Sequence, residues 1–197
     1  MSKDPALSIQ TVRARHPHFF EAVAADLRVT ALYRGERSEF RGRLDQLWQA
    51  IRLSVVSDAF FAQVCYRGKA RLQTLRIPLI PRILHRLAMM TAQVCIGDPV
   101  VVQPGLYLAH GQVVVDGFVD VGRGVVLFPW VTVGLLAGVI KGPTIGPNVH
   151  IGTGAKVIGP ITVGAGARVG ANAVVLDSVD PKTTVVGMPA RPVRDNQ

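Results

Sequence analysis

The sequence predicts an α+β protein in which an N-terminal helical domain, residues 1–92, precedes a parallel β-helix over residues 93–197. Two observations support this fold class. In the first half, apolar residues recur three and four positions apart, which is typical of amphipathic helices. In the second half, aliphatic residues recur every six positions, a period that neither a helix nor a strand produces alone. A short strand and a turn, repeated every six residues with three units to a coil, account for that period.

Three segments of the first half have the helical pattern: residues 19–35, 39–58 and 58–73. Pro78 and Pro81 then predict the start or the interruption of a helix, because proline lacks the backbone donor that a helix interior needs. A short amphipathic helix follows from Ile83 to Met90, with Arg82 and Arg86 on its polar side. Such a helix can pack against the next domain or lie on a lipid surface, and the sequence leaves both interpretations open.

The six-residue period of the second half covers two sets of aliphatic positions, offset from each other by one residue. The first set is Ile96, Val102, Leu108 and Val114, and the second is Val121, Leu127, Val133, Val139, Ile145, Ile151, Val157, Val163, Val169 and Val175. We expect these side chains to point into a triangular prism and to stack on their neighbours one coil away, about 4.8 Å along the axis. Each coil then contains 18 residues, three units of six.

Charge is unevenly distributed along the chain. Residues 1–90 contain 15 lysines and arginines against 7 acidic residues, whereas the remainder is nearly balanced. The basic excess is expected to form a solvated helical surface, although an anionic ligand or membrane face would also suit it. Neither zinc-finger spacing nor a basic region with heptads is present, so we expect no nucleic-acid partner.

Other features of the sequence indicate in which cellular compartment the protein is expected. No apolar run of eighteen residues is free of charge and proline, so we expect no transmembrane segment. The N-terminal residues have no apolar signal-peptide core. The two cysteines, Cys65 and Cys95, form no CxxC motif, which indicates reduced thiols and a cytoplasmic protein.

Residues 94–193 resemble the left-handed β-helix of the hexapeptide acyltransferases, and "VVGMPARPV" resembles the closing segment of that superfamily. Within it, the chain resembles the serine O-acetyltransferases, on the stretches "ADLRVTALYRG", "DAFFAQVCYRGKARL" and "QPGLYLAHGQVVVDG". The resemblance implies an acetyl-CoA-dependent O-acetyltransferase that acts on a small-molecule hydroxyl. It also implies a homotrimer, with a dimer of trimers as a larger possible assembly.

His110 is the candidate catalytic residue. An acceptor hydroxyl must lose a proton as it attacks a thioester, and histidine is the natural base for this near neutral pH. The resemblance places His110 in a cleft between neighbouring subunits, and no metal is needed. The alternative is a histidine that merely caps a turn. For the pantetheine arm of acetyl-CoA, the resemblance indicates an outer groove along Gly134, Thr153, Gly154, Arg168 and Ala171, which could equally be tight turns.

The acceptor side departs from the family pattern. Cys95 stands where the family has an aspartate that orients the histidine, and Ala109 stands where it has an acid that contacts the serine amine. Lys141 takes the place of an arginine that binds the substrate carboxylate, and Gly142 that of a second histidine. Three functions therefore stay open: acetylation of serine, acetylation of a sugar, polysaccharide or secondary-metabolite hydroxyl, and a non-catalytic trimeric scaffold.

Overall fold

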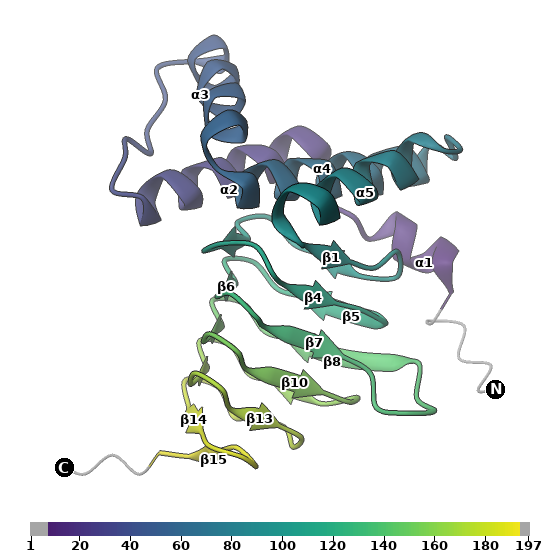
Figure 1. Cartoon of the computed structure of the whole chain (residues 1–197), viewed down its shortest axis with the longest axis vertical. Helices are drawn as coiled ribbons and strands as arrows, with labels where there is room; N and C mark the ends of the chain where they lie inside the picture. The colour runs from purple at the N-terminus through teal and green to yellow at the C-terminus, as the bar shows by residue number, and fades with distance from the viewer. Residues whose placement is uncertain (1–7, 194–197) are drawn as a thin grey trace.

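The structure, a computed structural model, describes residues 8–193 (Figure 1). Its helices are α1 (Ile9–Ala14), α2 (Phe19–Tyr33), α3 (Arg43–Val56), α4 (Asp58–Thr74) and α5 (Ile80–Ala92). Helices α2 to α5 form a layer across one end of a stack of short strands, and α1 lies beside the first strands. The last helix begins earlier than the sequence indicated, and Pro81 lies in its first turn, where proline needs no hydrogen-bond partner. Pro81, Ala88 and Ala92 are buried, which favours packing against the β-helix over a lipid surface.

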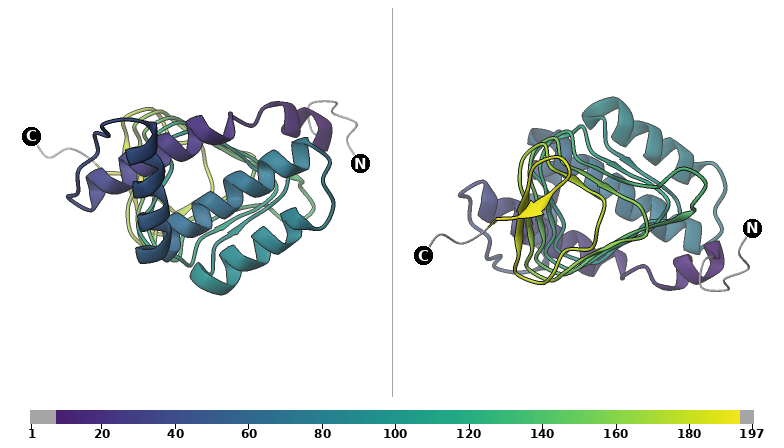
Figure 2. Two further views of the ribbon diagram at one scale, coloured as in Figure 1. Left: turned by 90° about the horizontal axis from the view of Figure 1, so that it is seen from above. Right: turned by 90° about the horizontal axis from the view of Figure 1, so that it is seen from below.

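The strands are two to five residues long and follow one another around a prism (Figure 2). They are β1 (Cys95–Ile96), β2 (Val101–Val102), β3 (Tyr107–Leu108), β4 (Val114–Val115), β5 (Phe118–Val121), β6 (Val126–Leu127), β7 (Thr132–Gly134), β8 (Lys141–Ile145), β9 (His150–Ile151), β10 (Lys156–Ile158), β11 (Thr162–Val163), β12 (Arg168–Val169), β13 (Val174–Val175), β14 (Thr184–Val186) and β15 (Arg191–Pro192).

These strands form three parallel sheets, one on each side of the prism. The first sheet has the order β1-β4-β7-β10-β13, the second β2-β5-β8-β11, and the third β3-β6-β9-β12-β14, extended by the antiparallel β15. From β1 to β14, consecutive strands lie in different sheets, so the hydrogen bonds between paired parallel strands join residues in neighbouring coils. This confirms a coiled parallel β-helix, whose interior is filled by the aliphatic residues of the repeat.

At two of the fourteen aliphatic positions, the prediction that the side chain points into the prism was wrong. Val114 is 39% exposed, and Val115, which is in phase with Val121, points inward instead. The extra residue that shifts the register therefore lies one six-residue unit earlier than the sequence indicated, between Leu108 and Val115, within the turn that follows β3. Val139 lies in residues 135–140, a loop between β7 and β8 that projects from the prism (Figure 1). Val121 pairs directly with Ile145, so this loop inserts six residues, which preserve the period but not the packing.

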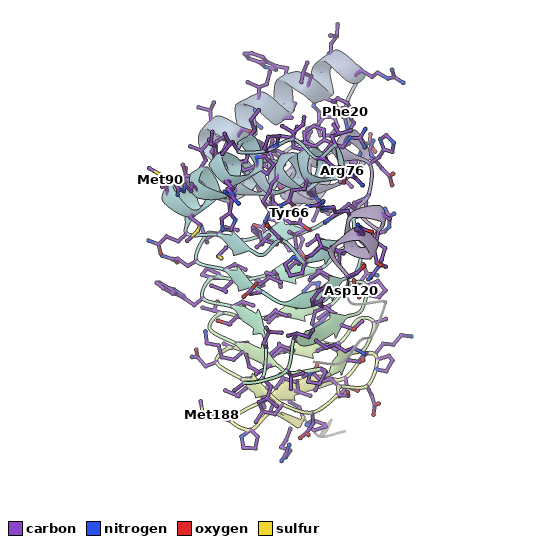
Figure 3. All side chains as sticks on the ribbon, turned by 90° about the vertical axis from the view of Figure 1, so that its right-hand side faces the viewer. Phe20, Tyr66, Arg76, Met90, Asp120 and Met188 are labelled. Carbon is purple, nitrogen blue, oxygen red and sulfur yellow. The ribbon has the colours of Figure 1, made fainter. Side chains whose placement is uncertain are left out.

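Helix α4 closes the helical end of the prism with polar side chains. The first coil has no preceding coil, so its outward carbonyls lack strand partners, and buried carbonyls without partners are costly. Gln63 donates to the Leu106 carbonyl at 2.6 Å, Tyr66 to that of Val100 at 2.8 Å, and Lys69 to that of Ile96 at 2.6 Å. Figure 3 shows Tyr66 at this junction between helices and β-helix. The helix thus replaces the missing coil.

Asp26 of α2 and Arg67 of α4 form a buried ion pair at the same junction. Arg67 Nε donates to Asp26 Oδ2 at 2.8 Å, and the two side chains are 3% and 1% exposed. Asp26 Oδ1 also accepts the backbone N–H groups of Gly105 and Leu106, at 2.8 and 2.9 Å. Burial raises the pKa of the Asp26 carboxyl, and its contacts with Arg67 and these two amides oppose the rise. The pair ties two helices to the segment that enters β3.

Helix α3 is an amphipathic helix with its apolar stripe turned outward. Only Leu53 of α3 is buried. The opposite side of the helix carries Leu44, Leu47, Trp48, Ile51 and Val55, which are 50–84% exposed. Their spacing of three and four residues makes one continuous stripe. Within residues 8–193, no helix combines the length and apolar character needed to cross a membrane.

Candidate active site

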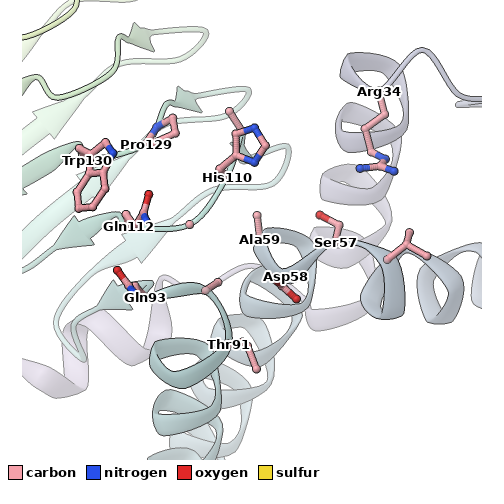
Figure 4. A pocket seen from close by; sticks show the side chains of 14 residues that line it. Arg34, Ser57, Asp58, Ala59, Thr91, Gln93, His110, Gln112, Pro129 and Trp130 are labelled. Atoms are coloured by element: carbon pink, nitrogen blue, oxygen red, sulfur yellow. The ribbon is translucent and has the colours of Figure 1, made fainter.

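His110 lies at the corner of the prism where the chain passes from the third sheet to the first. We call this edge the histidine corner; its turns are residues 109–113, 128–131, 152–155 and 170–173. A cavity of ≈570 Å³ opens here between the upper turns and the helical layer. It is lined by Arg34, Val56, Ser57, Asp58, Ala59, Thr91, Ala92, Gln93, Ala109, His110, Gly111, Gln112, Pro129 and Trp130 (Figure 4).

The end of α5 fixes the turn that carries His110. The Gln112 N–H donates to the Ala92 carbonyl at 2.8 Å. A Cβ added at Gly111 would lie 1.8 Å from that same carbonyl oxygen, so only glycine fits the position. On the other side, Tyr33 at the end of α2 stacks on Tyr107 of β3, with 4.3 Å between ring centroids. These contacts bring the ends of α2 and α5 to the rim of the cavity, with His110 exposed between them.

The residue in the middle of each turn at the histidine corner has a left-handed backbone. Going down the four turns, these residues are Gln112 (φ 65°), Trp130 (φ 66°), Gly154 (φ 75°) and Asn172 (φ 55°); Gln93 (φ 53°), the C-cap of α5, has the same backbone before the first coil. Glycine and asparagine adopt this conformation readily, but for bulky residues it is an outlier. It costs roughly 1–2 kcal/mol per residue. At the corner between the second and third sheets, the corresponding residues are Gly105, Gly124, Asn148 and Gly166, as local geometry favours, and Lys182 (φ 59°) in the last turn.

Five of the predicted site residues share the histidine corner. Ala109 and His110 belong to its upper turn, and Thr153, Gly154 and Ala171 to its two lower turns. The backbone N–H of Gly154 donates to the Pro129 carbonyl at 2.9 Å, and that of Asn172 to the Thr153 carbonyl at 2.8 Å, so the turns are stacked coil on coil. Arg168 lies on the adjoining face of the third sheet, paired in register with His150. Burial and the nearby Arg168 lower the pKa of His150.

The other three predicted site residues lie elsewhere in the chain. Cys95 lines a separate pocket with His85, Asp98 and Asp116. Burial, together with Asp116, raises the pKa of the Cys95 thiol, which therefore cannot supply the negative charge of an aspartate at neutral pH. Gly134 ends β7 and Lys141 begins β8, on either side of the loop at residues 135–140. One chain does not bring these residues to His110.

Gly142 lacks the side chain of the family's histidine, and the space beside it differs as well. A Cβ added there would lie 2.5 Å from Cγ2 of Val119. The space beside Gly142 is thus already filled from β5, and a histidine would require the backbone to move. Sequence comparison alone shows a missing histidine at this position; the structure shows that this coil has no room for one.

Sequence reasoning missed the polar residues that surround His110. Arg34, Ser57 and Asp58 come from the ends of helices, so no repeat pattern points to them. Gln112 and Trp130 did carry a signal, since they occupy the positions of the repeat that Gly154 and Asn172 occupy in lower coils. In the part of the chain from residue 8 to 193, no group of His, Cys, Asp and Glu side chains could hold a metal ion. The cavity offers an exposed imidazole, neutral hydrogen-bonding groups, and the charged side chains of Arg34 and Asp58.

Comparison with known proteins is consistent with this architecture. A family described as "Bacterial transferase hexapeptide (six repeats)" matches residues 142–177. The chain is similar to soybean serine acetyltransferase complexed with serine, with 30% identity and a TM-score of 0.72 over 91% of this chain and 71% of that one. No match was found among curated protein sequences.

Two further solved structures are similar over most of the chain. A serine acetyltransferase in complex with CoA has 25% identity and a TM-score of 0.74, over 93% of this chain and 73% of that one. Serine acetyltransferase from Vibrio cholerae O1 biovar El Tor N16961 has 26% identity and a TM-score of 0.73, over 95% and 70%. These similarities confirm the expected left-handed β-helix preceded by helices.

Proposed function

Because this chain belongs to the serine acetyltransferase family of hexapeptide-repeat acyltransferases, we propose that it transfers an acetyl group from acetyl-CoA to the hydroxyl of a small molecule. The observation that supports this most is the position of His110. It is an exposed imidazole in a cavity, and the small residues Thr153, Gly154 and Ala171 lie at the same corner, two and three coils away. A base and a groove for an extended thioester are the two parts that acetyl transfer needs.

In the proposed reaction, His110 accepts the proton of the acceptor hydroxyl. The hydroxyl oxygen attacks the thioester carbonyl, and a tetrahedral intermediate forms. The C–S bond then breaks, and the imidazolium returns its proton to the departing CoA thiolate, so the histidine ends neutral. No covalent enzyme intermediate is involved.

Serine is the first acceptor to test, since a relative is described as complexed with serine. The test is acceptor-dependent thiol release from acetyl-CoA, measured with serine, with sugars and with other hydroxyl compounds. Release with serine supports a serine acetyltransferase, and release with other acceptors only supports a changed specificity. If no acceptor gives thiol release, the proposal of an enzyme is contradicted and the scaffold is favoured.

The groove proposed for the pantetheine arm of acetyl-CoA, which we call the donor groove, can be tested separately. Ala171 is exposed at the histidine corner, and Ala171→Tyr would place a ring where the pantetheine arm is proposed to lie. We expect the Kd for CoA, measured by calorimetry, to rise about tenfold or more, which is a loss of about 1.4 kcal/mol. Ala165→Tyr is the matched control, because Ala165 is also exposed but lies at the corner between the second and third sheets. Equal effects of both variants, or none, would contradict the groove.

We further propose that the chain assembles as a cytoplasmic homotrimer. Lys141 lies away from His110 within one chain, so it could serve the site only from a neighbouring copy. The exposed apolar stripe of α3 also indicates a surface covered by another copy, since such stripes are normally buried. Light scattering at micromolar concentration is expected to give the mass of a trimer, or of a dimer of trimers. A monomer mass would overturn the assembly.

A further inference from the structure

The side chains of Gln93, Gln112 and Trp130 form a column along one wall of the His110 cavity. Gln112 and Trp130 come from equivalent positions in two successive coils, Gln93 is the C-cap of α5 before the first coil, and Figure 4 shows the three one below another. All three have the left-handed backbone for which glycine or asparagine is the ordinary choice. Strained positions of this kind are retained where they serve a site. At this corner the large side chains lie beside the cavity, whereas the lower coils have Gly154 and Asn172.

The chemistry of this column suits a saccharide. Each carboxamide offers a donor and an acceptor side by side, which matches two neighbouring hydroxyl groups of a sugar ring. Trp130 is 55% exposed, and its indole provides a flat apolar surface for the C–H face of the ring. Strand spacing sets the three side chains about 4.8 Å apart. Together they present neutral hydrogen-bonding groups and an aromatic surface.

An amino acid is a poorer match for the same cavity. A zwitterion calls for a cation and an anion near the base, and the position before His110 is the neutral Ala109. Arg34 is already paired with Glu36, to which its Nε donates at 2.7 Å. Asp58 lies in the first turn of α4, where the helix dipole accounts for an acid. The volume of ≈570 Å³ also lies in the range of sites for ligands much larger than serine.

From this geometry we propose that the acceptor is a pyranose, bound by Gln93, Gln112 and Trp130 with one hydroxyl directed at His110. The inference rests on the proposed function for the reaction itself, but the binding site does not depend on it. The reaction would form an O-acetyl ester on the sugar and release CoA as the free thiol, so atoms and protons balance as described above.

Binding can be tested without catalysis. The chain has two tryptophans, Trp48 and Trp130, so Trp48→Phe leaves Trp130 as the sole indole reporter. We expect saturable changes in its fluorescence on titration with methyl pyranosides of glucose, galactose and mannose or their 2-acetamido forms. L-Serine is expected to give none. A response to serine and to no pyranoside would overturn the inference and leave the proposed function intact.

Steady-state kinetics of variants provide a second test of the saccharide site. Trp130→Asn removes the indole, and Gln112→Asn draws the carboxamide back by one methylene group. Both place a residue suited to the left-handed backbone, so the fold is expected to be retained. We expect kcat/KM for the best pyranoside to fall about tenfold in Trp130→Asn, with KM for acetyl-CoA unchanged. Lys182→Asn is the matched control, since Lys182 has the same left-handed backbone (φ 59°) at another corner.

The possible outcomes distinguish the proposed saccharide site from the proposed acetyl transfer. Pyranoside binding without thiol release from any acceptor would support the saccharide site and contradict acetyl transfer. Serine turnover that is unaffected by Trp130→Asn and Gln112→Asn would overturn the saccharide site and support acetyl transfer. Loss of both binding and turnover in Lys182→Asn would show that the effects are structural, and would also overturn the site.

Discussion

Replacing His110 by alanine is expected to lower kcat for acetyl transfer by about 10²–10⁴-fold, the usual contribution of a positioned general base. The acceptor hydroxyl has too high a pKa to lose its proton to water as it attacks, so its nucleophilicity depends on the imidazole. The Kd for CoA is expected to stay within about twofold, because Thr153, Gly154 and Ala171 lie in other coils. Steady-state thiol release and calorimetry measure the two quantities separately.

The matched control for this variant is His150→Ala. His150 lies on β9, in the third sheet, and lines no part of the His110 cavity. Its loss is expected to leave kcat nearly unchanged. Circular dichroism should show both variants folded, since His110 is exposed and outside the prism. Full activity of His110→Ala on the best acceptor would contradict the catalytic role and favour a histidine that only caps a turn.

Asp26→Asn is expected to lower the free energy of unfolding by about 3–5 kcal/mol, the usual cost of removing one partner of a buried ion pair. The amide leaves the Arg67 guanidinium buried without its counter-charge. The amide oxygen can still accept the N–H groups of Gly105 and Leu106, which both donate to Oδ1, but the amide NH2 in place of Oδ2 cannot accept from Arg67 Nε. Urea unfolding followed by circular dichroism measures the loss.

Asp177→Asn is the control for Asp26→Asn. Asp177 is paired with Arg191 at 3.3 Å, but the two side chains are 79% and 64% exposed. Such surface pairs contribute about 0–1 kcal/mol, so little change is expected. If Asp26→Asn were as mild as this control, the buried pair would not hold the helical layer onto the first coil.

The six-residue period predicted the β-helix because its cause is local and repeated: each unit buries one aliphatic residue. The same rule failed at Val139, because an inserted loop of six residues keeps the phase of the sequence while leaving the prism. It also failed at Val114, because Val114 and Val115 are both aliphatic, so the apolar pattern is the same whether the extra residue comes before or after this unit. Periodicity reports which residues are suited to the core, but not which of them reach it.

The candidate site was predictable only in part. Resemblance pointed to His110 and to the small residues of the histidine corner, because these lie within the repeat. The polar residues of the cavity come from the ends of α2, α4 and α5, whose meeting depends on the Asp26–Arg67 pair and on the contact of Gln112 with Ala92. These contacts join residues distant in sequence and have no local pattern. Sequence spacing also gave Cys95 a place beside His110, whereas the structure places it in another pocket.

A crystal structure of the protein with CoA tests the central claim most directly. The account predicts that the thiol sulfur lies in the His110 cavity, about 3–3.5 Å from an imidazole nitrogen, as a reacting group must. The pantetheine arm should follow the histidine corner past Thr153, Gly154 and Ala171. CoA bound along another corner, beside Ala165 for example, with its sulfur remote from His110, would contradict it.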